Sequence, residues 1–152
     1  MSSSTVVAVV AVVDYGMGNI ASVTHSLRAL GYRVLVSNEI EVLNSADLLI
    51  LPGVGAFPAV MQNLYTNDLV TYLQEQASQG QRIIGICLGM QLLTNASYEH
   101  SYTEGLGIIP GEFVQFPDRR CHIGWNTLEC TREDTLLQGS NGQPFYFNHS
   151  FM

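Results

Sequence analysis

The sequence predicts an α/β fold, in which a mostly parallel sheet lies between two layers of helices in a three-layer αβα arrangement. Four runs are nearly continuous in Val, Ile and Leu, which is typical of strands that are buried on both faces. Segments with helical spacing separate these runs, and strands that alternate with helices pair in parallel. The chain has 152 residues, of which 47% are hydrophobic, and this is enough apolar material for one compact domain over residues 1–152.

The predicted elements alternate from the N-terminal end onward. The apolar run Val6–Val13 predicts the first strand. We prefer this to a membrane span, because the run is too short to cross a bilayer, and to a signal peptide, because no basic region precedes it. The next helix covers residues 20–30, with Asn19 as its cap and Gly31 at its end. The elements that follow are a strand at 32–37, a strand at 46–51 leading into a glycine-rich loop, a helical segment at 59–80 that is broken near Asn67 and Asp68 and capped by Gly80, a strand at 82–86, and a helix that gives way to a polar loop by residue 100.

Shorter strands joined by turns are expected after Gly105. The segments that favour them cover residues 105–117, 121–130 and 143–152. The sequence stops at Met152 directly after an apolar run, and a domain seldom ends on buried material. We therefore expect the last strand or strands and a helix to be missing.

The charge balance argues against two classes of partner. The formal net charge is −7 and the few Lys and Arg residues form no cluster, whereas phosphate groups are bound by concentrated positive charge. We therefore expect no nucleic acid and no membrane as a partner. The low charged fraction of 12% is also consistent with a surface that another subunit partly covers.

The cysteine pattern favours a reduced, cytoplasmic protein. Cys87, Cys121 and Cys130 are an odd count without framework spacing, and we expect no targeting segment. Cys121, His122 and Cys130 could be considered as metal ligands, but they include no C-x-x-C pair and no fourth ligand. We expect no metal and no other cofactor.

Three loops follow predicted strands and are expected to meet at one edge of the sheet. They cover residues 14–19, 52–55 and 85–91, and the first and second are rich in glycine. Ligands of parallel sheets bind beyond the carboxyl ends of the strands. The sequence therefore predicts a site at this edge.

Cys87 is the candidate nucleophile of that site. It lies at a strand-to-helix turn, where the free N–H groups and the dipole of the helix favour a thiolate. The N–H of Leu88 points toward an oxyanion formed by attack at Cys87, and Gly85 and Gly89 permit the tight turn. The alternative is an inert buried cysteine, which is the commoner role of a lone cysteine.

The glycine-rich loop at Gly53, Val54 and Gly55 supplies a second set of backbone donors. Such a loop can stabilise an oxyanion and let a substrate approach the backbone closely. By itself it could be an ordinary strand-to-helix turn. Together with Cys87, it predicts acyl transfer from a thiolate.

These motifs resemble those of the class I glutamine amidotransferases, and among them those of the glutaminase subunits of imidazole glycerol phosphate synthase. The resemblance covers essentially the whole chain. The segments at 85–91 and 52–55 are shared by several amidotransferases, whereas the loop at 14–19 and the segment at 122–126 favour the narrower group. The matching segments are “VVDYGMGNIASV”, “LPGVGAF”, “GICLGMQLL”, “GLGIIPG”, “HIGWNTL” and “FYFNHSF”.

The resemblance implies a flavodoxin-like fold and a glutaminase mechanism. Cys87 would attack the side-chain amide of glutamine, giving a glutamyl thioester and ammonia, and water would then release glutamate. The ammonia would pass to a cyclase subunit in histidine biosynthesis, and residues 14–19 would lie toward that partner rather than bind a dinucleotide. The implied oxyanion hole is formed by Gly53, Val54 and Leu88, and the implied glutamine-binding residues are Gly55, Gln91, His149 and Ser150.

The general base for Cys87 is the open question. His25 and His100 are expected at the surface, and His122 is expected to have a structural or interface role. From the residues alone His149 is the best candidate, because it follows an apolar run at a strand end. The resemblance implies instead a base in a His-Pro-Glu motif, which does not occur in the 152 residues. We therefore expect this chain to be a very poor glutaminase by itself.

Three alternatives remain open at this point. The chain could be another class I amidotransferase, such as one that serves anthranilate or aminodeoxychorismate synthesis, although the segment at 122–126 argues against this. It could be a catalytically dead protein that keeps only the partner surface. It could also be a cysteine hydrolase in which His149 is the base.

Overall fold

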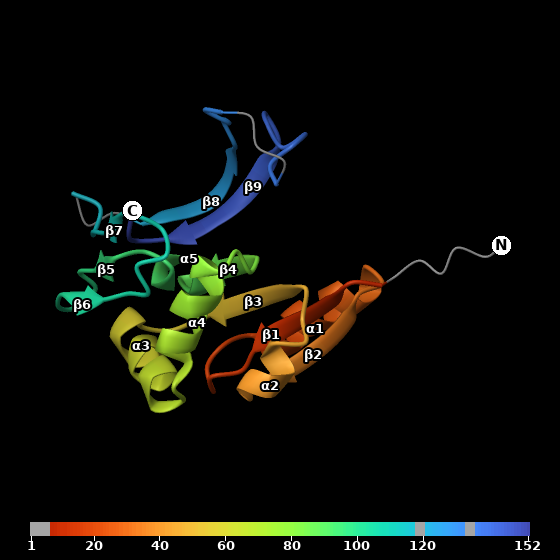
Figure 1. Cartoon of the computed structure of the whole chain (residues 1–152). Coiled ribbons are helices and arrows are strands. Elements are labelled where there is room, and N and C mark those ends of the chain that lie inside the picture. The colour runs from red at the N-terminus through yellow and green to blue at the C-terminus, as the bar shows by residue number, and fades with distance from the viewer. Residues whose placement is uncertain (1–6, 118–120, 133–135) are drawn as a thin grey trace. The chain divides into compact units, whose positions relative to one another are not determined.

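A computed structural model describes residues 7–117, 121–132 and 136–152 of the chain (Figure 1). The described residues form two compact units, one up to Phe113 and the other from Val114 onward.

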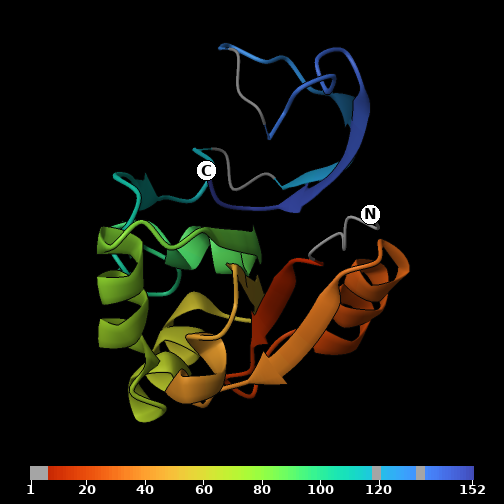
Figure 2. The ribbon, with the colours of Figure 1, turned by 45° about the vertical axis from the view of Figure 1, so that its right-hand side comes forward.

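The first unit contains a four-stranded parallel sheet, which confirms the predicted α/β class. Its strands are β1 (Val9–Val13), β2 (Arg33–Ser37), β3 (Leu48–Gly53) and β4 (Ile83–Cys87). They are arranged in the order β2-β1-β3-β4, so the chain winds outward from β1 in both directions (Figure 2). All four strands therefore end at the same edge of the sheet, with β1 and β3 in the centre.

Helices cover both faces of this sheet. They are α1 (Ile20–Ala29), α2 (Ile40–Leu43), α3 (Phe57–Thr66), α4 (Leu69–Ser78) and α5 (Leu88–Leu92). The backbone N–H of Ser22 donates to Asn19 Oδ1 over 3.3 Å, as the predicted cap requires. The predicted break lies between α3 and α4, where Asp68 has a φ of 57°.

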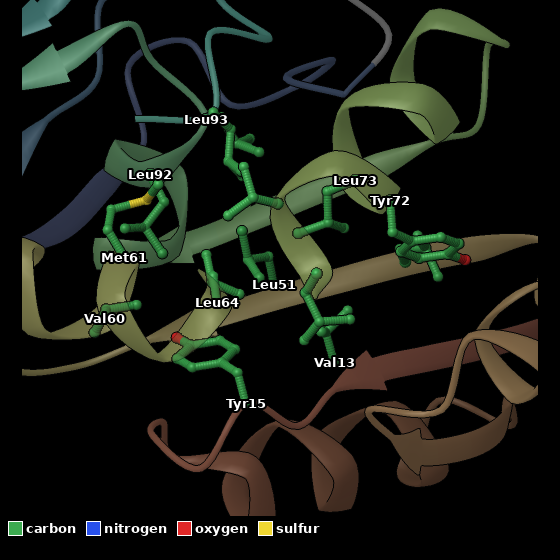
Figure 3. Packing of buried hydrophobic residues seen from close by; sticks show 14 of the residues in the cluster. Val13, Tyr15, Leu51, Val60, Met61, Leu64, Tyr72, Leu73, Leu92 and Leu93 are labelled. Carbon is green, nitrogen blue, oxygen red and sulfur yellow. The ribbon is translucent and has the colours of Figure 1, made fainter. Parts of the chain in front are cut away.

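Two apolar clusters place α1 on one face and α3, α4 and α5 on the other. Along β1, Val10 and Val12 pack toward α1, while Ala11 and Val13 belong to the larger cluster with the other helices. This alternation follows from the two-residue period of a strand. It also explains why β1 is apolar at every position. Figure 3 shows the larger cluster, in which Tyr15 lies near Leu64 and Val13.

A small second sheet follows α5 in the same unit. It consists of β5 (Ala96–Ser97), β6 (Thr103–Glu104) and β7 (Glu112–Phe113) in the order β6-β5-β7. The polar loop predicted near residue 100 thus contains two short strands, which are too short to show any periodicity in the sequence.

The second unit is built around one antiparallel hairpin. Its strands are β8 (His122–Thr127) and β9 (Pro144–His149), with His122 opposite His149. These strands confirm the short strands predicted in residues 121–130 and 143–152, whereas residues 105–117 contain only β7 and one bridge residue, Gln115. Within the described ranges, no helix is long and apolar enough to cross a membrane.

Candidate active site

Cys87 lies at a strained turn between β4 and α5. It is the last residue of the strand and the N-cap of the helix, with φ 56° and ψ −119°. Residues other than glycine rarely adopt a positive φ, and such strain is typical of nucleophiles presented on a strand-to-helix turn. The thiol is free and exposed. The predicted geometry of the turn is therefore present.

Two glycines allow α5 to begin directly against the sheet. A Cβ atom at Gly85 would lie 2.5 Å from the backbone nitrogen of Met90, and one at Gly89 would meet the carbonyl oxygen of Leu51. Neither position has room for a side chain. The first turn of α5 therefore packs backbone against backbone on β3 and β4, and this close packing fixes where Cys87 points.

The glycine-rich loop meets the same turn. Gly53 is opposite Cys87 in the register of β3 and β4. A Cβ atom at Gly53 would lie 2.8 Å from the carbonyl carbon of Leu88, so the backbones of Gly53 and Leu88 are in contact. Val54 is exposed next to them. The structure thus brings together Cys87, Leu88, Gly53 and Val54 from two separate motifs.

Gly55 and Gln91 come shortly after these residues in the chain, Gly55 in the glycine-rich loop and Gln91 in α5. Gly55 has a φ of 94°, a conformation that favours glycine, and its Cα faces Met17 of the first loop. Gln91 lies in α5, and its carbonyl accepts hydrogen bonds from the N–H and the hydroxyl of Thr94. Thr94, which follows α5, therefore holds the backbone of Gln91 in place.

The first loop is attached to the glycine-rich loop by Tyr15. The hydroxyl of Tyr15 donates to the carbonyl oxygen of Pro52, and Asn63 Nδ2 donates to the carbonyl oxygen of Tyr15 over 3.3 Å. Burial raises the pKa of the Tyr15 hydroxyl above its usual range, so the hydroxyl keeps its proton. Nearby, a Cβ atom at Gly18 would lie 3.2 Å from Cγ of Pro52. Sequence reasoning missed this role of Tyr15.

Glu99 is a second residue that sequence reasoning missed. Its Oε2 accepts a hydrogen bond of 2.6 Å from the backbone N–H of Phe57, at the start of α3. A carboxylate at a helix N-terminus satisfies a free donor and interacts favourably with the helix dipole. Glu99 therefore fixes the end of the loop that begins at Gly53. The two residues are 42 positions apart, so no local sequence signal indicates the contact.

The remaining predicted site residues, His149 and Ser150, lie in the second unit. Both ring nitrogens of His149 have partners there: Nδ1 is 2.9 Å from the carbonyl oxygen of Phe151, and Nε2 is 3.0 Å from Nδ1 of His122. A carbonyl only accepts, so Nδ1 of His149 donates to it, and in the neutral ring Nε2 of His149 accepts from His122. The ring of His122 stacks on Phe147 with a centroid distance of 4.5 Å.

This arrangement weakens the case for His149 as the base of Cys87. A general base needs an unoccupied nitrogen within reach of the proton that it removes. The accepting nitrogen of His149 is already used by His122. His25 and His100 are exposed, as expected. Within the described ranges, no three residues of the His, Cys, Asp and Glu types are grouped so as to hold a metal ion.

A family model described as glutamine amidotransferase class-I matches residues 11–152. The chain belongs to the class-I glutamine amidotransferase family. Curated members with the name imidazole glycerol phosphate synthase subunit HisH are similar to this amidotransferase chain. The protein from Aquifex aeolicus is 46% identical over 144 residues, which are 92% of this chain and 70% of the relative.

Two further relatives and one solved structure agree with this assignment. The HisH proteins from Listeria monocytogenes and Exiguobacterium sibiricum are 42% and 43% identical, over 93% of this chain and 70% and 68% of their own lengths. A chain titled “Crystal structure of glutamine amidotransferase” superposes with a TM-score of 0.72, covering 93% of this chain and 71% of that one. At 18% identity this structure supports the amidotransferase fold alone.

Proposed function

We propose that this amidotransferase chain is the glutaminase subunit of imidazole glycerol phosphate synthase. It would hydrolyse glutamine to glutamate and ammonia and pass the ammonia to a cyclase subunit in histidine biosynthesis. The observation that carries the proposal is the strained turn at Cys87, against which the glycine-rich loop packs. The HisH names of relatives at 42–46% identity support the choice within the family.

The reaction begins at the sulfur of Cys87. Its thiolate attacks the carbonyl carbon of the glutamine side chain, a C–S bond forms, and the carbonyl electrons move onto the oxygen. When the oxyanion collapses, the C–N bond breaks and the nitrogen leaves as ammonia after taking up a proton. Water then attacks the thioester, and glutamate and the thiol are released.

The oxyanion is stabilised by backbone donors from two loops. One is the N–H of Leu88, the first residue of α5, and the other comes from the Gly53–Val54 segment. Backbone donors that are fixed before the reaction need no reorganisation when charge develops, and this is why they lower the barrier. The contact between Gly53 and Leu88 keeps the two sets of donors next to each other.

The proposed glutamine-binding residues come from three segments of the chain. Gly55 leaves space for the substrate beside the glycine-rich loop, and Gln91 lies in α5 one helical turn after Cys87. His149 and Ser150 would contribute from the end of β9, where His149 is already held by His122 and by the carbonyl of Phe151. In this role His149 orients the segment and does not act as the base.

The proposed partner is the cyclase subunit, in a heterodimer that forms in the cytoplasm. The loop at 14–19 is the proposed contact on the first unit. On the second unit, Trp125 is 73% exposed and Tyr146 is 58% exposed, and their rings touch edge to face with centroids 5.7 Å apart. Exposed aromatic pairs of this kind are enriched at protein interfaces. The three free cysteines agree with a reducing compartment.

The direct test is glutamine hydrolysis by the chain together with the cyclase subunit. Glutamate release should be lost in Cys87→Ala and kept in Cys121→Ala, which removes another exposed cysteine. A stable complex with no thioester on Cys87 would favour the catalytically dead binding protein. Ammonia transfer to an anthranilate or aminodeoxychorismate synthase in place of the cyclase would favour another class I amidotransferase.

A further inference from the structure

A buried tyrosine holds the backbone at the start of the glycine-rich loop. The side chain of Tyr15 is 1% exposed and belongs to the larger apolar cluster, yet its hydroxyl donates to the carbonyl oxygen of Pro52. A buried hydroxyl and a buried carbonyl each lose water on folding, so each needs a partner. Tyr15 and Pro52 satisfy each other.

We propose that Tyr15 is a positioning residue for the oxyanion hole. The proposal rests on the function given above, in which the Gly53–Val54 segment donates to the oxyanion. The peptide bond is planar and trans, so the direction of the Pro52 carbonyl fixes the direction of the Gly53 N–H. Proline has no N–H, so this carbonyl is the one backbone group through which Pro52 can be held by a hydrogen bond.

Gly53 pairs with Cys87 and contacts Leu88, but the residues after it have few other restraints. Gly53 has no side chain, Val54 is 47% exposed, and Gly55 adopts a φ of 94°. Glycine is the least restricted residue, so a loop of this composition needs fixed points at its two ends. Glu99 holds the far end at Phe57, and Tyr15 holds the near end at Pro52.

Tyr15 is itself held through the peptide bond that follows it. Its carbonyl oxygen accepts from Asn63 Nδ2 in α3, and the neighbouring N–H of Gly16 donates to Asp14 Oδ1 over 3.0 Å. The ring is enclosed by the core (Figure 3). The hydroxyl therefore has little freedom to leave the Pro52 carbonyl. In this way Tyr15 holds the loop at 14–19 against the glycine-rich loop.

The chain offers a matched control in Tyr72. It belongs to the same apolar cluster and is 5% exposed, but its hydroxyl has no hydrogen-bond partner in the part of the chain that the structure describes. Tyr15→Phe and Tyr72→Phe therefore remove the same atom from the same core. Only the first change releases a backbone carbonyl of the glycine-rich loop.

The experiment compares these two variants by amide hydrogen exchange and by kinetics. In Tyr15→Phe the exchange of the Gly53 and Val54 amides should be faster, while Tyr72→Phe leaves it unchanged. In complex with the cyclase subunit, kcat for glutamine should fall ~10-fold with KM nearly unchanged, a smaller loss than the ~10²–10³-fold typical of deleting an oxyanion donor. Asn63→Ala is a second, milder variant and should change both readouts in the same direction.

The outcomes separate this inference from the proposed function. Unchanged exchange at Gly53 and Val54 in Tyr15→Phe, or a rise in KM at constant kcat, would overturn the role of Tyr15. If the unaltered complex releases no glutamate, or if its activity survives Cys87→Ala, the proposed function fails instead. The exchange measurement still decides whether Tyr15 positions the loop in that case.

Discussion

Gly53 and Cys87 lie opposite each other as the last residues of the adjacent parallel strands β3 and β4. One pair of strands therefore carries both the candidate nucleophile and the start of the loop that would stabilise the oxyanion. The turn of α5 closes over both, because Gly53, Gly85 and Gly89 leave no room for side chains. The relative position of the two chemical groups is set by main-chain packing.

Gly53→Ala is expected to damage both stability and activity. The added methyl group would collide with the backbone of Leu88 and Gly89, and overpacking of this kind costs ~1–3 kcal/mol of unfolding free energy. Urea denaturation measures the change, and glutamate release should fall because the Leu88 amide is displaced. Gly80→Ala is the control: it has open space among the described residues and should cost ~1 kcal/mol through its positive φ alone, with activity kept.

Glu99→Ala is expected to destabilise the first unit by ~1 kcal/mol, as the loss of a helix-capping acceptor typically does. The N–H of Phe57 would lose its partner at the start of α3. Thermal or urea unfolding tests this. Glu104→Ala removes an exposed carboxylate from the same loop region and should change the unfolding free energy by less than about 0.5 kcal/mol. Equal effects of the two changes would contradict the capping role.

His149→Ala is expected to raise KM for glutamine more than it lowers kcat. Both ring nitrogens of His149 have partners in the second unit, so its removal should loosen the proposed binding segment without removing a base. Steady-state kinetics of the complex with the cyclase subunit gives the two constants. A kcat loss of ~10²–10⁴-fold at constant KM, the usual effect of deleting a general base, would favour the cysteine hydrolase instead.

The sequence predicted the parallel sheet and the turn at Cys87 because both have local signals. Apolar runs identify β1, β3 and β4, and the pattern of two glycines around Cys87 identifies the strand-to-helix turn. The short helix α2 was not predicted, since four residues are too few to show helical spacing. In the same way, β5 and β6 have two residues each and lie within a polar segment.

The contacts that hold the site could not be predicted in the same way. Tyr15 binds the carbonyl of Pro52, and Glu99 binds the N–H of Phe57, across 37 and 42 positions. Each joins a side chain to a backbone atom, and any residue offers such an atom. Only the fold decides which carbonyl or N–H lies within reach. The pairing of His122 with His149 likewise required the register of β8 and β9.

The central claim is that Cys87 is the nucleophile for glutamine, and covalent labelling tests it most directly. The chain, in complex with the cyclase subunit, is treated with a diazoketone analogue of glutamine and analysed by peptide mass spectrometry. We predict one adduct on Cys87, none on the exposed Cys121, and protection of Cys87 by excess glutamine. Equal labelling of Cys87 and Cys121, or labelling that glutamine does not reduce, would contradict it.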